Sequence, residues 1–197
     1  MASRARKSKH GARQEKAGLR LGVAGAVILG ALVTCCIAVV VMCTVWLQDL
    51  PDYNDASAYN YAEKTKVYAN DGTTLLAEFY LENRDPIDLD EMGTYVTKGT
   101  VATEDERFYQ HNGIDVLGIA RAVWVNVTHT GHEGASTITQ QFVRNTILAD
   151  EATESTLKRK VREAYIAIKL EESYSKDEIL QMYLNTINYG QGAYGIQ

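Results

Sequence analysis

The stretch ATEDERFYQHNGID, residues 102–115, places two adjacent carboxylates, Glu104 and Asp105, just ahead of several aromatic residues. A carboxylate at a helix edge beside aromatic rings can be partly desolvated, which raises its pKa toward the range useful for a general base. Thr103 is placed to cap a turn together with Glu106. The stretch therefore predicts a general base. The alternative is that these acids simply face water, as most do.

A second polar cluster occupies GASTITQQFVRN, residues 134–145. Thr137 and Gln140 have the spacing of a capping box, which predicts that a helix begins here. A helix start offers free N–H groups and a positive dipole end, both suited to phosphate oxygens. Ordinary capping explains Thr137 and Gln140, but not the second glutamine or the arginine that follow. We interpret the cluster as a cradle for a polar, phosphorylated ligand, formed by Ser136, Thr137, Thr139, Gln140, Gln141 and Arg144.

The third stretch, KRKVREAYIAIKLEE, predicts a helix with a basic face opposite an apolar stripe. Such a basic face can neutralise a diphosphate. Arg159 and Glu163 are four residues apart and can pair, so the alternative is a solvated salt bridge of little energetic value. The basic face comprises Lys158, Arg159, Lys160 and Arg162. The stripe comprises Leu157, Val161, Ala164, Tyr165 and Ile168.

Mostly helical elements are predicted to position these residues. Asp71-Gly72 lies between two extended segments and indicates a hairpin, whose second strand alternates as in a half-buried strand at Leu75, Ala77, Phe79 and Leu81. From Asp90 onward the spacing is helical, and Ser175 and Glu178 form a second capping box. The fold class is therefore mainly α with one small β-hairpin.

The segment GIDVLGIARAVWVNV is predicted to be a helix capped by Asp115. Its expected core positions are Val116, Ile119, Ala120, Val123 and Val127. Leu117, Trp124 and Val125 lie beyond that stripe, and the only charges of the segment are Asp115 and Arg121. So much apolar surface outside a core stripe indicates contact with a bilayer. The alternative is that all of it is buried in the core.

Charge is distributed unevenly along the 197 residues. Residues 1–20 carry seven Lys/Arg and one acid, a net charge of +6; the remaining 13 basic and 24 acidic residues give −11, and the sum is −5. An acidic body does not indicate a nucleic-acid partner. No charge occurs between Arg20 and Asp49, and about 20 apolar residues suffice to span a bilayer.

This pattern predicts a single-pass cell-membrane protein with a cytoplasmic basic tail at 1–20, a transmembrane anchor at 21–48, a linker at 49–63 and an extracellular domain at 64–197. All three cysteines, Cys35, Cys36 and Cys43, fall within the anchor, so no disulfide framework is expected outside it.

Four stretches in order resemble the glycosyltransferase domain of class A penicillin-binding proteins and monofunctional peptidoglycan glycosyltransferases, over about residues 64–197. The first motif, E-D-x-x-F-x-x-H-x-G, matches Glu104, Asp105, Phe108, His111 and Gly113. The second, G-x-S-T-I-T-Q-Q, matches Gly134 and 136–141; the third, R-K-x-x-E, matches Arg159, Lys160 and Glu163; the fourth, K-x-x-I-L-x-x-Y-L-N, matches Lys176, Ile179, Leu180, Tyr183, Leu184 and Asn185.

The sequence departs from this family's pattern in two places. Ala135 stands where a second glycine is usual, and the fifth motif, R-x-x-x-V-L-x-x-M, does not occur before Gln197. We therefore expect a glycosyltransferase domain that is C-terminally incomplete. A transpeptidase domain beyond Gln197 is one possibility.

The resemblance implies a lysozyme-like, two-lobed fold that polymerises lipid II into β-1,4-linked glycan with inversion and release of undecaprenyl diphosphate. Its partners would be lipid II, the nascent glycan strand, the membrane, and cell-wall synthesis and division proteins. Glu104 would be the base. Glu163 would hold a magnesium or manganese ion or orient basic side chains. Substrate would be bound by Asp105, Phe108, His111, Ser136, Thr137, Thr139, Gln140, Gln141, Arg144, Arg159, Lys160 and Asn185.

Two other function classes are compatible with parts of the sequence. A lysozyme-type hydrolase would need a second carboxylate acting on water and no basic diphosphate site, and the basic run at 158–162 argues against it. A catalytically inactive, membrane-anchored scaffold would not need Glu104 and Glu163, and both are present.

Overall fold

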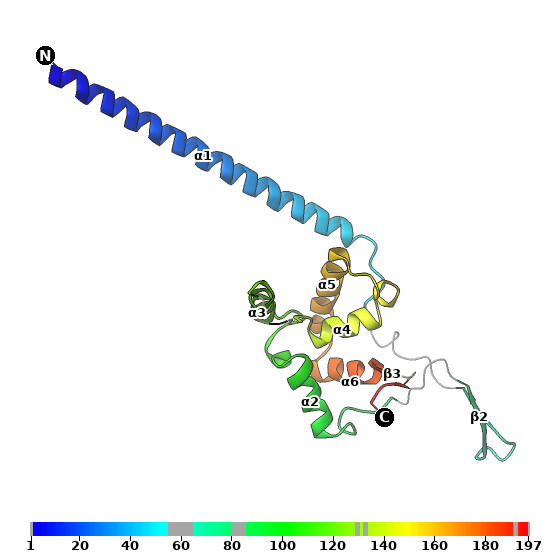
Figure 1. Cartoon of the computed structure of the whole chain (residues 1–197). Coiled ribbons are helices and arrows are strands. Elements are labelled where there is room, and N and C mark those ends of the chain that lie inside the picture. Colours follow the sequence, from blue (N-terminus) through cyan, green and yellow to red (C-terminus); the bar gives the residue numbers. More distant parts are fainter. Residues whose placement is uncertain are drawn as a thin grey trace. The chain divides into compact units, whose positions relative to one another are not determined.

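The computed structural model describes residues 2–54, 65–79, 86–128, 131, 134–190 and 193–196, with the backbone alone for residues 2–22 and 24. The chain divides into two compact units, Met1–Gln48 and Asp49–Gln197 (Figure 1). Each unit is described by itself below.

The first unit is the helix α1, Ala2–Trp46. Its segment Gly25–Trp46 has a mean hydropathy of 2.8 and is long and apolar enough to cross a membrane. Within the described residues, no other helix meets both conditions. No proline interrupts this run, so every residue in it has the backbone amide that a helix needs. The predicted apolar helix is therefore present, and its backbone continues toward the N-terminus through the basic residues.

The second unit begins with an antiparallel hairpin of β1, Thr65–Tyr68, and β2, Leu75–Phe79. Asp71 and Gly72 form the turn, where Gly72 has a φ of 71°. The predicted hairpin is confirmed, but its predicted half-burial is wrong, because Leu75 is 47% and Phe79 is 64% exposed. Alternating apolar residues indicate a strand, yet they do not determine whether another element covers its apolar face. Leu81 lies outside the described residues.

Helices are the main regular elements of the second unit. They are α2 Thr94–Glu104, α3 Val116–Val127, α4 Ile138–Asn145, α5 Leu157–Ser173 and α6 Lys176–Thr186, with short 3₁₀ turns at η2 Phe108–Gln110 and η3 Ala149–Glu151. A second small hairpin, β3 Asn188–Gly190 and β4 Ala193–Tyr194, follows α6. The prediction of a mainly helical chain is confirmed, but the expectation of a single β element is wrong.

The hydrophobic core gathers around α4, which packs against both α5 and α6 (Figure 1). Fully buried side chains from these helices and from η2 fill it, among them Phe108, Phe142, Ile166, Leu170 and Leu184. Leu50 and Tyr53 also pack against this cluster. The start of the predicted linker is therefore attached to the domain, because these two residues have apolar surface to bury.

The starts of three helices agree with the predicted caps. Capping boxes are present at Thr137–Gln140 and Ser175–Glu178, and Asp115 caps α3 by accepting a hydrogen bond from the Gly118 amide at 2.9 Å. The predicted cap at Thr103 is wrong, because α2 continues through Thr103 and ends at Glu104.

The predicted orientation of α5 is wrong in part. Val161, Ala164 and Tyr165 of its expected apolar stripe are half-buried. Of its expected apolar stripe, Leu157 is 65% exposed and Ile168 is 36% exposed. The buried face instead carries Arg159, Arg162, Glu163, Ile166, Ala167 and Leu170. Charged residues can occupy this face because each has a partner of opposite charge beside it, as described below.

Helix α3 is also placed differently from the predicted core stripe. Val116, Val123 and Val127 are more than half exposed, and Ile119 and Ala120 are exposed too. Only Gly118 and Ala122 of this helix are buried. The alternative that all of its apolar residues are buried in the core is therefore wrong for this helix.

Candidate active site

A cleft of about 540 Å³ lies where the C-terminal end of α2 meets α3 and the segment leading into α4. Carboxylates, hydroxyls, one amide and three arginines line it. The lining side chains are Glu104, Asp105, Glu106, Arg107, Asp115, Arg121, Ser136, Thr137, Gln141 and Arg144, together with small residues between them. Two of the three stretches selected for their chemistry therefore meet at one cavity.

Glu104 is the last residue of α2 and its side chain is exposed on the cleft wall. Its Oε2 accepts a hydrogen bond from Gln141 Nε2 at 3.0 Å. The expected desolvation of this carboxylate is wrong, because the aromatic residue that follows it, Phe108, is fully buried in the core. The Glu104 carboxylate is thus accessible to solvent, and a hydrogen bond from Gln141 holds one of its two oxygens.

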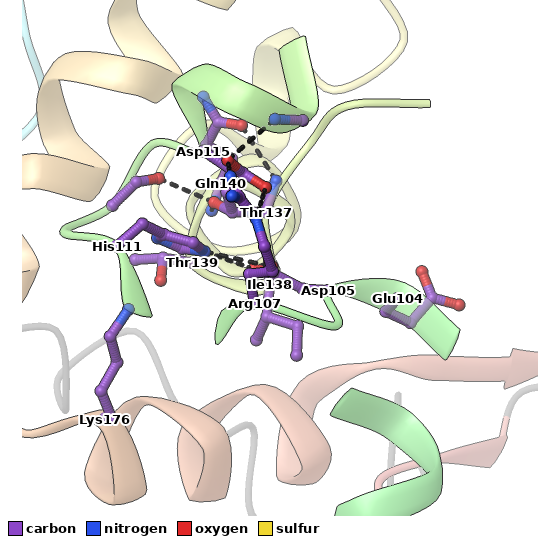
Figure 2. Close-up of polar contacts among 12 residues, drawn as sticks. Glu104, Asp105, Arg107, His111, Asp115, Thr137, Ile138, Thr139, Gln140 and Lys176 are labelled. Atoms are coloured by element: carbon purple, nitrogen blue, oxygen red, sulfur yellow. Dashed lines mark hydrogen bonds and ion pairs between the residues drawn. The ribbon is translucent and has the colours of Figure 1, made fainter. Parts of the chain in front are cut away.

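Asp105, the next residue, points the other way. It is 8% exposed, and its two oxygens lie 3.1 and 3.0 Å from His111 Nε2. One oxygen also accepts the Ile138 amide at 3.1 Å, at the start of α4, where the helix dipole favours a negative charge. Figure 2 shows Asp105 directed into this cluster and Glu104 directed away from it. Asp105 therefore anchors the loop, and that attachment leaves Glu104 at the cleft.

The second motif divides between the cleft and the interior. Ser136, Thr137, Gln141 and Arg144 line the cleft, whereas Gln140 closes the capping box and Thr139 donates to the buried Glu171 at 2.5 Å. Only part of the predicted phosphate cradle therefore faces the cavity.

The start of α4 is connected to α5 through Gly113, which lies in the loop before α3. Thr137 donates to the Gly113 carbonyl oxygen at 2.7 Å. Gly113 has a φ of 79°, and a Cβ there would lie 2.7 Å from the backbone of α5. This position therefore requires glycine. Phe108 and His111 belong to the same buried support and do not line the cleft.

The third motif forms a buried ion cluster on α5. Glu163 is fully buried and pairs with Arg159 through one oxygen and with Lys160 Nζ through the other, at 2.8 Å. Lys160 Nζ also donates to Ser136 Oγ at 3.1 Å, on the segment that lines the cleft. The ion cluster thus connects α5 to the cleft wall through one lysine.

The expectation of a basic surface on α5 is wrong for two of its four residues. Arg159 is 7% exposed and also donates to the Glu154 carbonyl oxygen. Arg162 is 4% exposed, pairs with Glu151 at 3.2 Å and donates to the Asp49 carbonyl oxygen at 2.6 Å. Both guanidinium groups bind other parts of the fold, which leaves Lys158 and Lys160 as the more accessible cations of these four residues.

The arrangement around Glu163 does not fit a divalent cation as it stands. Both carboxylate oxygens are occupied by cationic side chains, and such neighbours repel a metal ion. Among the residues that the structure describes, no three His, Cys, Asp or Glu side chains come together as ligands. The divalent cation stays a prediction, and no step below depends on it.

Asn185 ties α6 to the segment before α2. Its side chain is 2% exposed, donates to the Ile87 carbonyl oxygen at 2.9 Å and accepts from the Ile87 amide at 3.2 Å. It does not line the cleft, so its predicted contact with substrate has no geometric support here.

Sequence reasoning missed two cleft arginines. Arg107 donates to Asp115 through Nε at 3.0 Å, and thereby joins the loop after Glu104 to the cap of α3. Arg121 lines the cleft from α3 and is the one charged residue within that helix. A single charge in an otherwise apolar helix was the available signal, because such a charge usually faces water or a ligand.

The sequence of this chain was also compared with those of known proteins. A family model described as transglycosylase matches residues 71–197, more than half of the chain. The chain belongs to the transglycosylase family.

Relatives of this transglycosylase include penicillin-binding proteins. Penicillin-binding protein 2D of Bacillus subtilis is 41% identical over 172 residues, or 87% of this chain and 24% of that protein. Penicillin-binding protein 1A of Escherichia coli is 42% identical over 149 residues, or 75% of this chain and 17% of that protein. Penicillin-binding protein 1A of Rickettsia bellii is 39% identical over 153 residues, or 76% of this chain and 19% of that protein. This transglycosylase chain spans about a fifth of the length of these relatives.

Proposed function

We propose that this transglycosylase domain polymerises lipid II into β-1,4-linked glycan strands and releases undecaprenyl diphosphate. The observation that carries the proposal is the position of Glu104. Its carboxylate is exposed in a cleft of about 540 Å³, and among the described residues its hydrogen bond is made through Oε2, from Gln141. Oε1 is therefore available to take a proton from a bound hydroxyl group.

The reaction follows from the chemistry of a glycosyl diphosphate. The 4-hydroxyl oxygen of the acceptor sugar attacks the anomeric carbon of the donor, and Glu104 takes the hydroxyl proton. A new C–O bond forms as the bond from that carbon to the diphosphate breaks, and the electron pair leaves with the diphosphate. Because the donor bond is α, attack from the opposite side inverts the anomeric centre to β.

A diphosphate is a good leaving group, so the cleft needs positive charge rather than a second acid. Arg121 and Arg144 line the cavity. Lys160 reaches its wall through Ser136 and is held in place by Glu163. This geometry supports the role of Glu163 in orienting a basic side chain. Arg159 contributes indirectly, as the buried ion partner of Glu163 on α5.

The finer parts of the proposal concern fold and location. They are a lysozyme-like, two-lobed domain, a single-pass cell-membrane anchor with a cytoplasmic N-terminus, and contacts with cell-wall synthesis and division proteins. The excess of basic residues before the apolar segment supports this topology. A magnesium or manganese ion also remains part of the proposal, and it would supply further positive charge to the leaving diphosphate.

The test is an assay of the full chain in liposomes with fluorescent lipid II. Polymeric glycan with β-1,4 linkages and stoichiometric undecaprenyl diphosphate would support the proposal. Cleavage of preformed glycan without polymerisation would instead support a lysozyme-type hydrolase. If the chain binds lipid II but shows neither activity, the result would support the inactive scaffold.

We also propose that α3 contacts the bilayer surface. Leu117 is 67% exposed and Trp124 is 72% exposed, and the neighbouring valines are exposed as well. A lipid-linked substrate gives a reason for such a surface, because the enzyme must meet its substrate at the membrane.

Tryptophan fluorescence tests this contact, because the chain has only two tryptophans, Trp46 and Trp124. After Trp46→Phe, lipids brominated along their acyl chains should quench Trp124 strongly in proteoliposomes. Acrylamide in the water phase should quench it weakly. Strong acrylamide quenching with no effect of the brominated lipids would contradict the proposal.

A further inference from the structure

Three side chains form a continuous line of hydrogen bonds from the core to the cleft. The Tyr183 hydroxyl on α6 donates to Gln141 Oε1 on α4 at 3.1 Å. Gln141 Nε2 then donates to Glu104 Oε2 at the end of α2, at 3.0 Å. Tyr183 is fully buried, Gln141 is half-buried and Glu104 is exposed. The line therefore connects a rigid interior position to the carboxylate proposed to act as the base.

The chemistry of the three groups fixes the direction of both bonds. An ionised carboxylate only accepts hydrogen bonds, so the Gln141 NH₂ group must face Glu104. Its carbonyl oxygen then faces Tyr183, which must donate. Burial, followed by the negative charge of Glu104, raises the pKa of Tyr183, so the hydroxyl keeps its proton. A flipped amide would turn its carbonyl oxygen toward the Glu104 carboxylate, and the bond to Glu104 would be lost.

We propose that Tyr183 and Gln141 are positioning residues for Glu104, which hold its carboxylate at the cleft with Oε2 occupied and Oε1 free. An exposed glutamate has several rotatable bonds and would otherwise sample many positions. A tie to a buried hydroxyl reduces that freedom before substrate binds, and small errors in the placement of a base are costly. The catalytic part of this inference rests on the proposed function, whereas the hydrogen-bonded line itself does not.

The line can be tested without turnover by NMR of the full chain in nanodiscs, labelled with ¹⁵N-glutamine. Gln141→Leu identifies the Gln141 side-chain amide signal by its loss. Glu104→Ala and Tyr183→Phe should each move that signal. Tyr109→Phe is the matched control, since it removes a hydroxyl that donates to Asp177 at 3.0 Å and lies outside the cleft. A signal unchanged by Glu104→Ala and Tyr183→Phe would overturn the proposed line.

Kinetics on lipid II tests whether the line serves catalysis. Tyr183→Phe keeps the buried ring and removes one hydrogen bond, so kcat should fall about fivefold to tenfold, with KM changed less than about twofold. In a Gln141→Leu background the same substitution should have no further effect, because the line is already broken. An equal loss in both backgrounds, or no loss of kcat, would overturn the positioning role.

The two experiments separate this inference from the proposed function. If wild-type protein does not polymerise lipid II, the proposed function fails, while the NMR result still decides whether the line exists. Thermal unfolding accompanies each variant. If Tyr183→Phe prevents folding, Gln141→Leu alone should still lower kcat, and unchanged kcat in that variant would overturn the inference.

Discussion

The packed helices α4, α5 and α6 bury several charged and polar residues beside their apolar core, whereas the helix α3 exposes most of its apolar residues. Inside the first group lie Glu163, Arg159 and Thr139, each nearly or fully buried. On α3, by contrast, Trp124 and Leu117 are among the most exposed apolar side chains of the second unit. Sequence spacing predicts which residues share a face of a helix, but the neighbouring elements decide which face is covered.

The difference has a physical reason in each region. Removing two charges from water costs several kcal/mol per ion, and a close pair with further hydrogen bonds can offset much of that cost. Glu163 has such partners in Arg159 and Lys160. Exposed apolar surface on α3 has no such compensation in water, and a bilayer would provide it. The two regions therefore predict different responses to substitution.

The largest effect on stability is expected from Glu163→Ala. This change leaves the buried Arg159 without its ion partner, which should lower the free energy of unfolding by about 3–5 kcal/mol. Denaturant unfolding of the full chain in detergent would measure it. Glu172→Ala, on the same helix, removes a surface partner of Lys169 and should change the midpoint very little. If both variants lose a similar free energy of unfolding, burial of the ion cluster does not make it more important for stability than a surface ion pair.

A matched pair of leucine truncations compares the two regions directly. Leu184 is fully buried on α6, so Leu184→Ala should cost about 2–5 kcal/mol through lost burial and a residual cavity. Leu117→Ala should stay within about 0.5 kcal/mol in detergent, because that side chain is 67% exposed. The measurement is again denaturant unfolding. A loss above about 2 kcal/mol in Leu117→Ala would mean that α3 is packed against other residues in solution. The proposed difference between α3 and the packed helices would then be wrong.

The smallest effect concerns the turn of the first hairpin, whose strands are also largely exposed. Hydrogen bonds from the Thr74 hydroxyl and amide and from the Thr73 amide lower the pKa of Asp71 to about 2. The bonded turn is therefore favoured above about pH 4, the ordinary range of an Asp, and this contribution is lost as the pH falls through about 2. The amide shifts of Thr73 and Thr74 should follow this titration, and a midpoint near 4 would contradict it.

Local signals in the sequence predicted the starts of α3, α4 and α6, since each of these caps is formed by residues a few positions apart. Thr137 with Gln140, Ser175 with Glu178, and Asp115 are all found as expected. The turn at Asp71-Gly72 was predictable for the same reason. Hydrogen bonds within a turn depend little on the rest of the chain.

Contacts between distant residues were not predictable in this way. The line through Gln141 joins residues 37 and 42 positions apart, and nothing in the local pattern specifies it. The inward orientation of Arg159 and Glu163 depends on partners that tertiary packing supplies. The motifs predicted Glu104, Asp105, Ser136, Thr137 and Gln141 at one site, and the polar cluster added Arg144. These residues line the cleft, whereas Thr139 and Asn185 do not.

Glu104→Gln tests the central claim most directly, because it removes the proposed base while keeping the side chain's size and its neighbours. Lipid II polymerisation by the variant in proteoliposomes should fall by about 10²- to 10⁴-fold, with lipid II binding retained. Glu106→Gln, which alters a neighbouring exposed carboxylate of the same cleft, should keep most of the turnover. Near wild-type polymerisation by Glu104→Gln would contradict the account, and a comparable loss in Glu106→Gln alone would move the base to that residue.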